Sequence, residues 1–324
     1  MVLSEWRIAL VSLKPIRYVY METTNYCNLR CSFCNREDVI GKLQHMPIEK
    51  WELLLKNISN HPIEEAKLMG MGEPFLHPHF DEVCRLFKKQ FPNSRLIVAT
   101  NCQYKMLPRF IEGMKYIDQL YFSIDGYKES YERDRSPAKW SKLMSFLEEF
   151  KQVDRKTCQV VVNYVVNNQN INDIQKVHDE ILIPYGLEEL RLNIAQDWSE
   201  NSSINDTVGG YSQEQLQYLR DNWQDNIKGK SKWDFNDCFW PQHGLYTTVE
   251  GRVLMCALNT GAREFGNLFY QDIDEIRMSD EYNAVRSGCQ TNDPTNHCRN
   301  CSYKELAPLL SELGVQNEAQ VSSI

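Results

Sequence analysis

Short apolar runs alternate with longer amphipathic stretches over the first two thirds of this chain, and this alternation constrains its fold more than any other feature. The runs are almost continuously apolar, as in YVY, LIVA and VVVNYVV, which is typical of parallel strands buried on both faces. In the amphipathic stretches apolar residues recur every three to four positions, as in helices that cover a sheet. The pattern predicts strands at residues 17–23, 66–70, 95–99, 119–124, 159–166 and 190–194, and helices at residues 48–59, 80–91, 139–153 and 174–182.

Six such units predict an α/β fold, a partial (β/α)6 TIM-like barrel. Barrels of this kind carry their active site at the carboxyl ends of the strands. Polar motifs follow the first four predicted strands, and we therefore expect them to gather on one face. They are a cysteine motif, GMGEP at 70–74, Thr100-Asn101-Cys102 and the segment 123–126.

Cys27, Cys31 and Cys34 form the motif C-x3-C-x2-C directly after the first predicted strand. Structural zinc normally takes four ligands. A disulfide knot needs an oxidising compartment, and the short apolar stretch 8–13 is followed by Pro15 and Arg17 rather than by a signal-peptide cleavage site. Three thiolates on a cubane iron–sulfur cluster leave one iron open to an exogenous ligand. The motif favours this open cluster over zinc, a disulfide knot or packing cysteines.

The last third of the chain predicts a second, smaller unit. Residues 197–210 are polar and rich in Gly, Ser and Asn, which predicts a linker or long loop before a helix at 213–223. YTTVEGRVLMC predicts a hairpin with Glu250-Gly251 in its turn. We therefore divide the chain into an N-terminal segment (1–16), the barrel (17–227) and a small cysteine-rich α+β domain (228–324).

With C-x3-C-x2-C after the first strand and Gly72-Glu73-Pro74 after the second, the chain resembles the radical S-adenosylmethionine (radical SAM) superfamily. Its C-terminal part resembles the SPASM/twitch domains of that family, which open with C-x(9–15)-G-x4-C, here Cys238, Gly251 and Cys256. A four-cysteine site would be completed by Cys298 and Cys301. Only five cysteines follow residue 230, so we expect one auxiliary 4Fe–4S cluster, as in the shorter twitch version, with zinc as the alternative for four thiolates.

The resemblance implies that a 4Fe–4S cluster on the first three cysteines binds SAM and cleaves it reductively to a 5′-deoxyadenosyl radical, which abstracts hydrogen from the substrate. A flavodoxin- or ferredoxin-type electron donor is implied as a partner. The SAM contacts that the resemblance implies are an aromatic ring near adenine, a site for the methionine amino group, and partners for ribose or carboxylate. Phe33 would be the ring near adenine, and the amino group would bind at Gly70, Gly72 and Glu73. The partners for ribose or carboxylate would be Ser123, Asp125 and Arg135.

Several residues keep two interpretations. Phe33 could be a packed ring, and Arg135 lies in the charge-rich ERDR segment that could be a solvated face. Cys102 and Cys289 are possible hydrogen donors or inert packing residues, and packing is the expectation for the remaining two cysteines, Cys84 and Cys158. His77 and His79 are expected to shape a turn. The base for a substrate alcohol is not fixed, and strand-end candidates are Arg191, Asn193 and Asp197.

Composition narrows the class of protein. A net charge of −8, from 44 acidic and 36 basic residues, argues against a nucleic-acid partner, and no apolar run reaches the ~18 residues of a membrane span. We expect a cytoplasmic enzyme for a small polar substrate, such as a sugar or aminocyclitol, that the radical reaction oxidises. The alternatives are an epimerase with a cysteine hydrogen donor, a peptide-modifying (RiPP) maturase, a nucleic-acid methylating enzyme and a non-catalytic iron–sulfur or zinc module. Only 26 residues precede Cys27, which makes the maturase less favoured.

Overall fold

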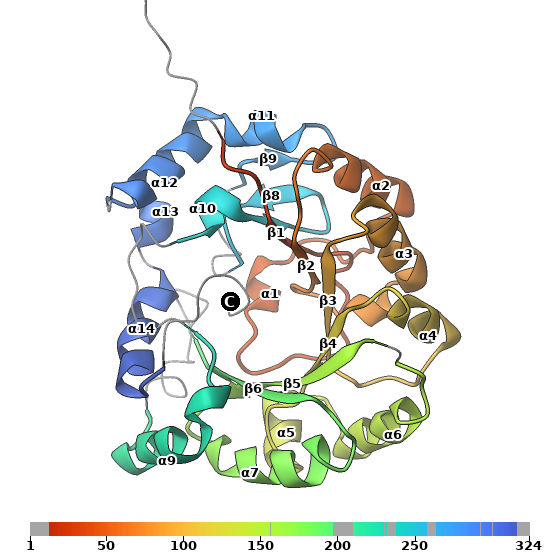
Figure 1. Cartoon of the computed structure of the whole chain (residues 1–324), viewed down its shortest axis with the longest axis vertical. Helices are drawn as coiled ribbons and strands as arrows, with labels where there is room; N and C mark the ends of the chain where they lie inside the picture. The colour runs from red at the N-terminus through yellow and green to blue at the C-terminus, as the bar shows by residue number, and fades with distance from the viewer. Residues whose placement is uncertain are drawn as a thin grey trace, which may run out of the picture.

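The computed structural model describes residues 13–155, 157–196, 210–229, 231, 238–257, 264–291, 293–299 and 301–315. A curved sheet forms the centre of the molecule, and Figure 1 shows its strands arranged as an incomplete ring with most helices outside it. The strand order is β6-β5-β4-β3-β2-β1-β7-β8-β9. None of the described helices is long and apolar enough to cross a membrane.

The six predicted strands are confirmed, each within two residues at either end, and neighbours pair in parallel. They are β1 (Tyr18–Met21), β2 (Glu65–Leu68), β3 (Arg95–Thr100), β4 (Gln119–Ser123), β5 (Gln159–Val166) and β6 (Glu189–Ile194). Alternate side chains point to opposite faces. Val19 and Ala66 join the main apolar core, whereas Tyr20 and Lys67 line the interior of the barrel.

The predicted helices are also confirmed: α2 (Ile48–Asn57), α3 (Phe80–Gln90), α6 (Trp140–Phe150), and α7 (Ile174–Val177), which continues as the π-helical turn His178–Leu182. With α4 (Pro108–Met114) they cover the outer side of the curved sheet (Figure 1). α4 and α5 (Glu129–Asp134) were not predicted, because helices of six or seven residues are too short to show a helical repeat. The other elements of this half are α1 (Arg36–Val39) and the 3₁₀ turns Pro74–Leu76 and Ile171–Asp173.

The predicted hairpin is formed by β7 (Gly244–Thr247) and β8 (Arg252–Leu254), which are antiparallel, and β9 (Gly266–Asn267) follows beside β8. Unexpectedly, β7 also pairs in parallel with β1, with Tyr246 opposite Tyr20. The C-terminal hairpin therefore extends the barrel sheet. The predicted domain boundary at residue 228 is not tested by this pairing and remains a prediction.

Helices complete the C-terminal part. Helix α9 (Gln213–Trp223) matches the predicted bounds and begins with a capping box at Ser212, whereas the predicted linker lies almost wholly outside the described residues. In Figure 1 the C-terminal helices continue the ring past β6. The remaining elements are the 3₁₀ turn Gln224–Asn226, α10 (Trp240–His243), α11 (Ile273–Arg277), α12 (Asp280–Gln290), α13 (Asn296–Arg299) and α14 (Ser302–Glu312).

Candidate active site

The barrel contains a cavity of about 590 Å³, which is within the usual range for a small-molecule site. All four polar motifs that follow the first four strands contribute to its wall, so the prediction that they gather on one face is confirmed. The lining residues from these motifs are Cys27, Cys31, Cys34, Gly70, Met71, Gly72, Glu73, Thr100, Asn101 and Ser123.

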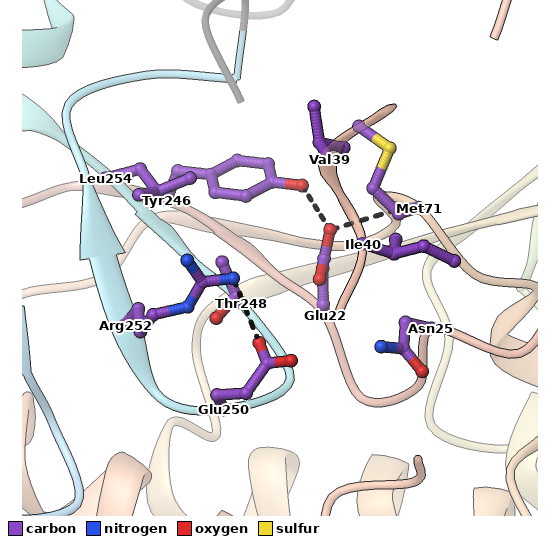
Figure 2. Close-up of a pocket in the computed structure, with 10 residues that line it drawn as sticks. All are labelled: Glu22, Asn25, Val39, Ile40, Met71, Tyr246, Thr248, Glu250, Arg252 and Leu254. Atoms are coloured by element: carbon purple, nitrogen blue, oxygen red, sulfur yellow. Dashed lines mark hydrogen bonds and ion pairs between the residues drawn. The ribbon is translucent and has the colours of Figure 1, made fainter. Parts of the chain in front are cut away.

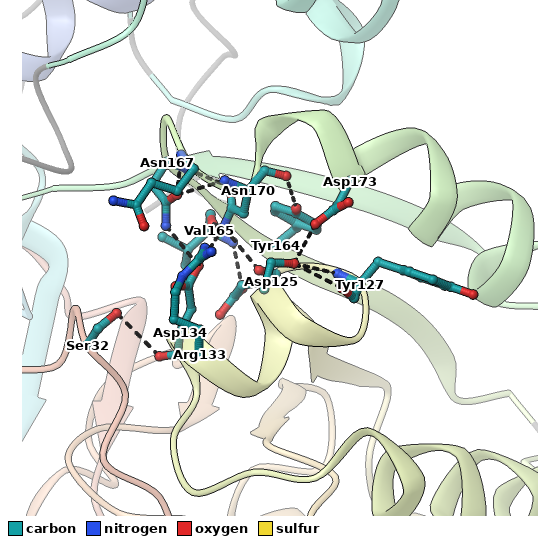
Figure 3. A network of polar contacts seen from close by, with 12 residues as sticks. Ser32, Asp125, Tyr127, Arg133, Asp134, Tyr164, Val165, Asn167, Asn170 and Asp173 are labelled. Atoms are coloured by element: carbon teal, nitrogen blue, oxygen red, sulfur yellow. Dashed lines mark hydrogen bonds and ion pairs between the residues drawn. The ribbon is translucent and has the colours of Figure 1, made fainter.

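The cysteine loop is held by the segment that ends α5. The backbone N–H of Ser32 donates to the carbonyl of Asp134 at 2.9 Å, and that of Arg30 donates to Ser136 at 2.6 Å. Figure 3 shows Ser32 beside Asp134, whose buried carboxylate in turn accepts from Asn167 at 3.1 Å. The loop that carries the three thiols therefore rests on a buried polar network.

Two donors face the thiols themselves. Arg135 Nη1 lies 3.8 Å from Cys31 Sγ, and Asn101 Nδ2 lies 3.9 Å from Cys27 Sγ. Burial raises the pKa of the Cys27 thiol to about 11 and that of Cys31 to about 12, while the positive charge of Arg135 opposes the shift at Cys31. Without bound iron the Cys27 and Cys31 thiols are therefore protonated at neutral pH, and binding of iron must displace their protons.

Arg135 is fixed by a buried ion pair. Its Nε lies 2.5 Å from Asp125 Oδ2, its side chain is buried, and its guanidinium stands 5.5 Å from the centre of the Phe33 ring. Phe33, Ser123 and Arg135 all line the cavity, whereas Asp125 is fully buried behind them. Asp125 accepts from the backbone of Val165 at 2.7 Å, so its carboxylate orients Arg135, and direct contact of Asp125 with SAM remains a prediction.

Glu73 is buried at the cavity wall and accepts three hydrogen bonds. Oε1 accepts from the Thr100 hydroxyl at 2.8 Å and from the Phe75 backbone at 3.2 Å, and Oε2 accepts from the Asn101 backbone at 2.7 Å. A carboxylate has about four acceptor positions, so one remains for a ligand. Burial raises the pKa of Glu73 to about 7 against the effect of these bonds.

Close packing explains the glycines of GMGEP. A Cβ on Gly72 would lie 2.0 Å from the carbonyl oxygen of Thr24, and a Cβ on Gly70, whose φ is +155°, would lie 2.4 Å from Glu22. Only glycine lets the loop approach the segment after β1 so closely.

Glu22, which our sequence analysis missed, joins three parts of the site. It is the residue after β1, and its Oε1 accepts from the Tyr246 hydroxyl at 2.5 Å and from the Met71 backbone at 3.0 Å (Figure 2). Its Oε2 accepts from the Val249 backbone at 3.3 Å. Burial raises its pKa. A glutamate at a strand end carries no sequence signal of this role, because the partners come from distant segments.

The two possible hydrogen donors do not line the cavity. Cys102 has a left-handed φ of +58°, is fully buried in the main core and donates to the Thr100 carbonyl at 3.8 Å. Cys289 is buried on α12, where it forms a hydrogen bond with the thiol of Cys298. Packing therefore accounts for Cys102, whereas Cys289 lies among the C-terminal thiols. A hydrogen-donor role for either cysteine remains a prediction.

The C-terminal cysteines form a second group. Burial raises the pKa of Cys238, and the neighbouring thiols of Cys256, Cys289 and Cys301 raise it further. Cys298 lies close enough to Cys238 and Cys256 for their charges to raise its pKa as well, although its hydrogen bond with Cys289 has the largest effect. Thiols from five positions of the chain thus meet in one region.

Among the described residues, no three His, Cys, Asp or Glu side chains lie close enough together to bind one metal ion, and this holds for both cysteine groups. A cubane cluster binds each thiolate through a different iron and so does not require a single meeting point. The thiol donor sets fit such clusters.

The other predicted residues are placed as follows. His77 is buried and contacts the Met46 carbonyl at 2.9 Å, and its Nδ1 accepts from the backbone of His79 at 3.1 Å, so both shape a turn as predicted. Cys84 and Cys158 are buried, as expected of packing residues. Arg191 and Asn193 line the cavity, and Asp197 lies outside the described residues.

Comparison with known proteins agrees with this geometry. Residues 21–181 match the model of the radical SAM superfamily, and residues 238–302 match SPASM, an iron–sulfur cluster-binding domain. The chain belongs to the radical SAM superfamily and is an enzyme of that family with a C-terminal SPASM domain. Its cofactors are accordingly SAM and 4Fe–4S clusters, including an auxiliary one.

Curated relatives match only in part. The GTP 3′,8-cyclase of Chlorobaculum tepidum is 28% identical over 88 residues, which are 27% of this chain and 26% of the relative. The sporulation killing factor maturation protein SkfB of Bacillus subtilis is 22% identical over 172 residues, 49% of this chain and 38% of the relative. The chain thus covers well under half the length of these proteins.

Solved structures share the fold over most of the chain. SuiB of Streptococcus suis bound to S-adenosylmethionine superposes with a TM-score of 0.66 and 16% identity, over 90% of this chain and 71% of SuiB. BtrN in complex with AdoMet and 2-DOIA superposes with a TM-score of 0.56 and 15% identity, over 89% of this chain and 94% of BtrN. At these identities the similarity establishes the fold alone.

Proposed function

We propose that this chain is a radical SAM oxidoreductase of the dehydrogenase type, which oxidises a small polar substrate held in the barrel cavity. The extent of the cavity carries the proposal. Its wall includes the three cysteines of the first motif and also Ala257, the neighbour of Cys256. One space of about 590 Å³ thus extends from the first cysteine group to the residue next to Cys256. An oxidation in which the radical starts at the first group and the electron leaves to the second is served by such proximity.

When bound, the cofactors supply a 5′-deoxyadenosyl radical at the first site and an electron acceptor at the second. The first cluster would be held by Cys27, Cys31 and Cys34, and Glu73 would offer its remaining acceptor position to the SAM amino group. The Asp125–Arg135 pair presents a fixed cation beside Phe33 and Cys31. The auxiliary cluster would be held by Cys238, Cys256, Cys298 and Cys301.

The cavity wall supports a sugar- or aminocyclitol-like substrate. Ser123, Asn163 and Asn193 line it from three neighbouring strands and present hydroxyl and amide groups. BtrN, which the chain covers almost completely, was solved with AdoMet and 2-DOIA. We expect the electron for SAM cleavage to come from a flavodoxin- or ferredoxin-type donor in the cytoplasm.

The test is anaerobic turnover of the reconstituted protein with a reductant, SAM and candidate polyols. We expect 5′-deoxyadenosine and a product two hydrogens lighter than its substrate. Cys31→Ala should abolish formation of 5′-deoxyadenosine, and the matched variant Cys158→Ala, which changes a buried thiol outside the cavity, should preserve it. Incorporation of one solvent deuterium into a product of unchanged oxidation state would refute oxidation in favour of epimerisation.

A peptide-modifying activity is the second candidate. The match to SkfB, named as a maturation protein, extends over 49% of this chain. SuiB has also been solved bound to its precursor peptide SuiA, with a TM-score of 0.64. A modified peptide product in the same assay, without oxidation of any polyol, would favour this alternative.

A further inference from the structure

Four strands place polar side chains in the interior of the barrel. Tyr20 comes from β1, Lys67 from β2, Tyr121 from β4 and Arg191 from β6, and all four line the cavity. Each is at least nine-tenths buried. Tyr121 also packs with Ile97 and Val161 in a small apolar cluster. These four residues therefore form the floor of the cavity, and we refer to them as the cavity floor.

The cavity floor consists of two pairs, each with one cation and one phenol. Lys67 Nζ donates to the Tyr20 hydroxyl at 2.8 Å, and Arg191 Nη1 donates to the Tyr121 hydroxyl at 2.6 Å. Lysine and arginine side chains can only donate, so in both pairs the phenol oxygen must be the acceptor.

This arrangement determines which hydrogen bonds the two phenol hydroxyls can still form. A hydroxyl that accepts from a cation keeps its own proton for another partner, and the cation makes that proton a stronger donor. Among the described residues, neither phenol hydroxyl donates a hydrogen bond. The hydroxyl protons of Tyr20 and Tyr121 thus have no acceptor among the described residues, and each hydroxyl lies beside a cation at the cavity wall.

We propose that the cavity floor binds an oxyanion of the substrate, a carboxylate or a phosphate, through the hydroxyls of Tyr20 and Tyr121 and the charges of Lys67 and Arg191. The inference rests on the proposed function, since it names the substrate class of the same cavity. An anion held at the floor directs the rest of the molecule toward the cysteine motif and Glu73, at the carboxyl ends of the strands. The floor thereby selects which C–H bond faces the radical.

The charges around Lys67 predict how binding depends on pH. Burial lowers the pKa of Lys67 to about 8, the nearby Arg191 and Arg95 lower it, and Glu65 at 3.5 Å raises it. An oxyanion would raise it again and so favour the ammonium form. Binding should be strongest below pH 8 and should weaken up to about tenfold per unit above it. The charged or titratable groups that face Lys67 are Tyr20, Glu65, Arg95, Tyr121 and Arg191.

The test uses the reconstituted protein saturated with SAM, so that the SAM site is filled, and anaerobic titration calorimetry with three probes. Inorganic phosphate represents a phosphate group, acetate represents a carboxylate, and myo-inositol is the neutral control. Tyr20→Phe and Tyr121→Phe remove one hydroxyl each with little change in packing. Tyr18→Phe is the matched control, because the Tyr18 hydroxyl donates to Glu64 at the exposed end of the same strand.

We expect phosphate or acetate to bind, and whichever binds identifies the group. Tyr20→Phe and Tyr121→Phe should each weaken that binding about tenfold or more, and Tyr18→Phe should not. Lys67→Met should remove the decline of binding above pH 8. Absence of binding by both anions, equal binding in all variants, or binding of myo-inositol alone would overturn the inference. Formation of 5′-deoxyadenosine by the wild-type protein is measured separately, so failure of the proposed function would be distinguishable.

Discussion

Glu73→Gln tests the SAM site most directly. Glu73 is buried, accepts three hydrogen bonds and retains one acceptor position beside the cavity. Its pKa of about 7 means that half of the SAM-free protein carries a neutral Glu73 at neutral pH. A SAM ammonium group at this position would favour the carboxylate, so SAM binding should release a proton from Glu73 below pH 7.

The size of this pH effect follows from the linkage between SAM binding and the protonation of Glu73. If the ammonium restores the pKa of Glu73 to the ordinary carboxyl value of 4.5, the shift is worth about 3 kcal/mol, at 1.36 kcal/mol per pKa unit. The Kd for SAM should then be about tenfold higher at pH 6 than at pH 8 in the wild-type protein. In Glu73→Gln the Kd should not change with pH in this way and should exceed the wild-type value at pH 8 by tenfold or more, because a charged hydrogen bond is lost.

Anaerobic titration calorimetry of the reconstituted protein at both pH values measures these constants. Glu64→Gln is the matched control, because Glu64 is about half exposed on the outside of the barrel and pairs with Arg17. A second readout is stability without SAM: a raised carboxyl pKa stabilises the folded state below pH 4.5, and this contribution is lost as the pH rises through 7. If Glu73→Gln kept both the wild-type affinity and its pH dependence, Glu73 would not be the amino-group site.

Three further results are expected. Gly72→Ala should lower the free energy of unfolding by about 1–3 kcal/mol in denaturant titrations because its Cβ meets a carbonyl oxygen at 2.0 Å, whereas Gly41→Ala, with open space around it, should be neutral. Tyr246→Phe should cost about 1.5–3 kcal/mol by the same measurement, since it removes a donor from the buried Glu22, and an unchanged stability would contradict that bond. Iron analysis after anaerobic reconstitution should give about eight irons per chain and about four in Cys301→Ser; a wild-type count near four with stoichiometric zinc would argue against an auxiliary cluster.

The sequence was enough to predict the first six strands and the gathering of motifs at their ends. Those predictions depend on local patterns: apolar runs mark buried strands, and the position of Cys27 or Glu73 after a strand fixes its place at the carboxyl edge. The same reasoning placed the hairpin turn at Glu250-Gly251, where Gly251 has a φ of +79°.

Other features depend on contacts between distant segments, and no local pattern reports them. The pairing of β7 with β1 is one, and the hydrogen bond between Glu22 and Tyr246 is another. Cys102 shows that a position after a strand does not by itself fix where a side chain points. Its place after β3 suggested exposure to the cavity, but the residue has a left-handed backbone conformation and is buried in the core. The facing of Lys67 and Arg191 toward one floor likewise required the register of the whole sheet.

The position of β7 beside β1 also has a consequence for biosynthesis. Glu22 and its partner Tyr246 are 224 residues apart, so on the ribosome β1 is made long before its second neighbour exists. Until β7 arrives, the nascent barrel has an open edge at the strand that leads into the cysteine loop, and non-local pairing of this kind is slow to form. We therefore expect the machinery that inserts iron–sulfur clusters to act on a completed chain, with both cysteine groups becoming competent in the same late step of folding.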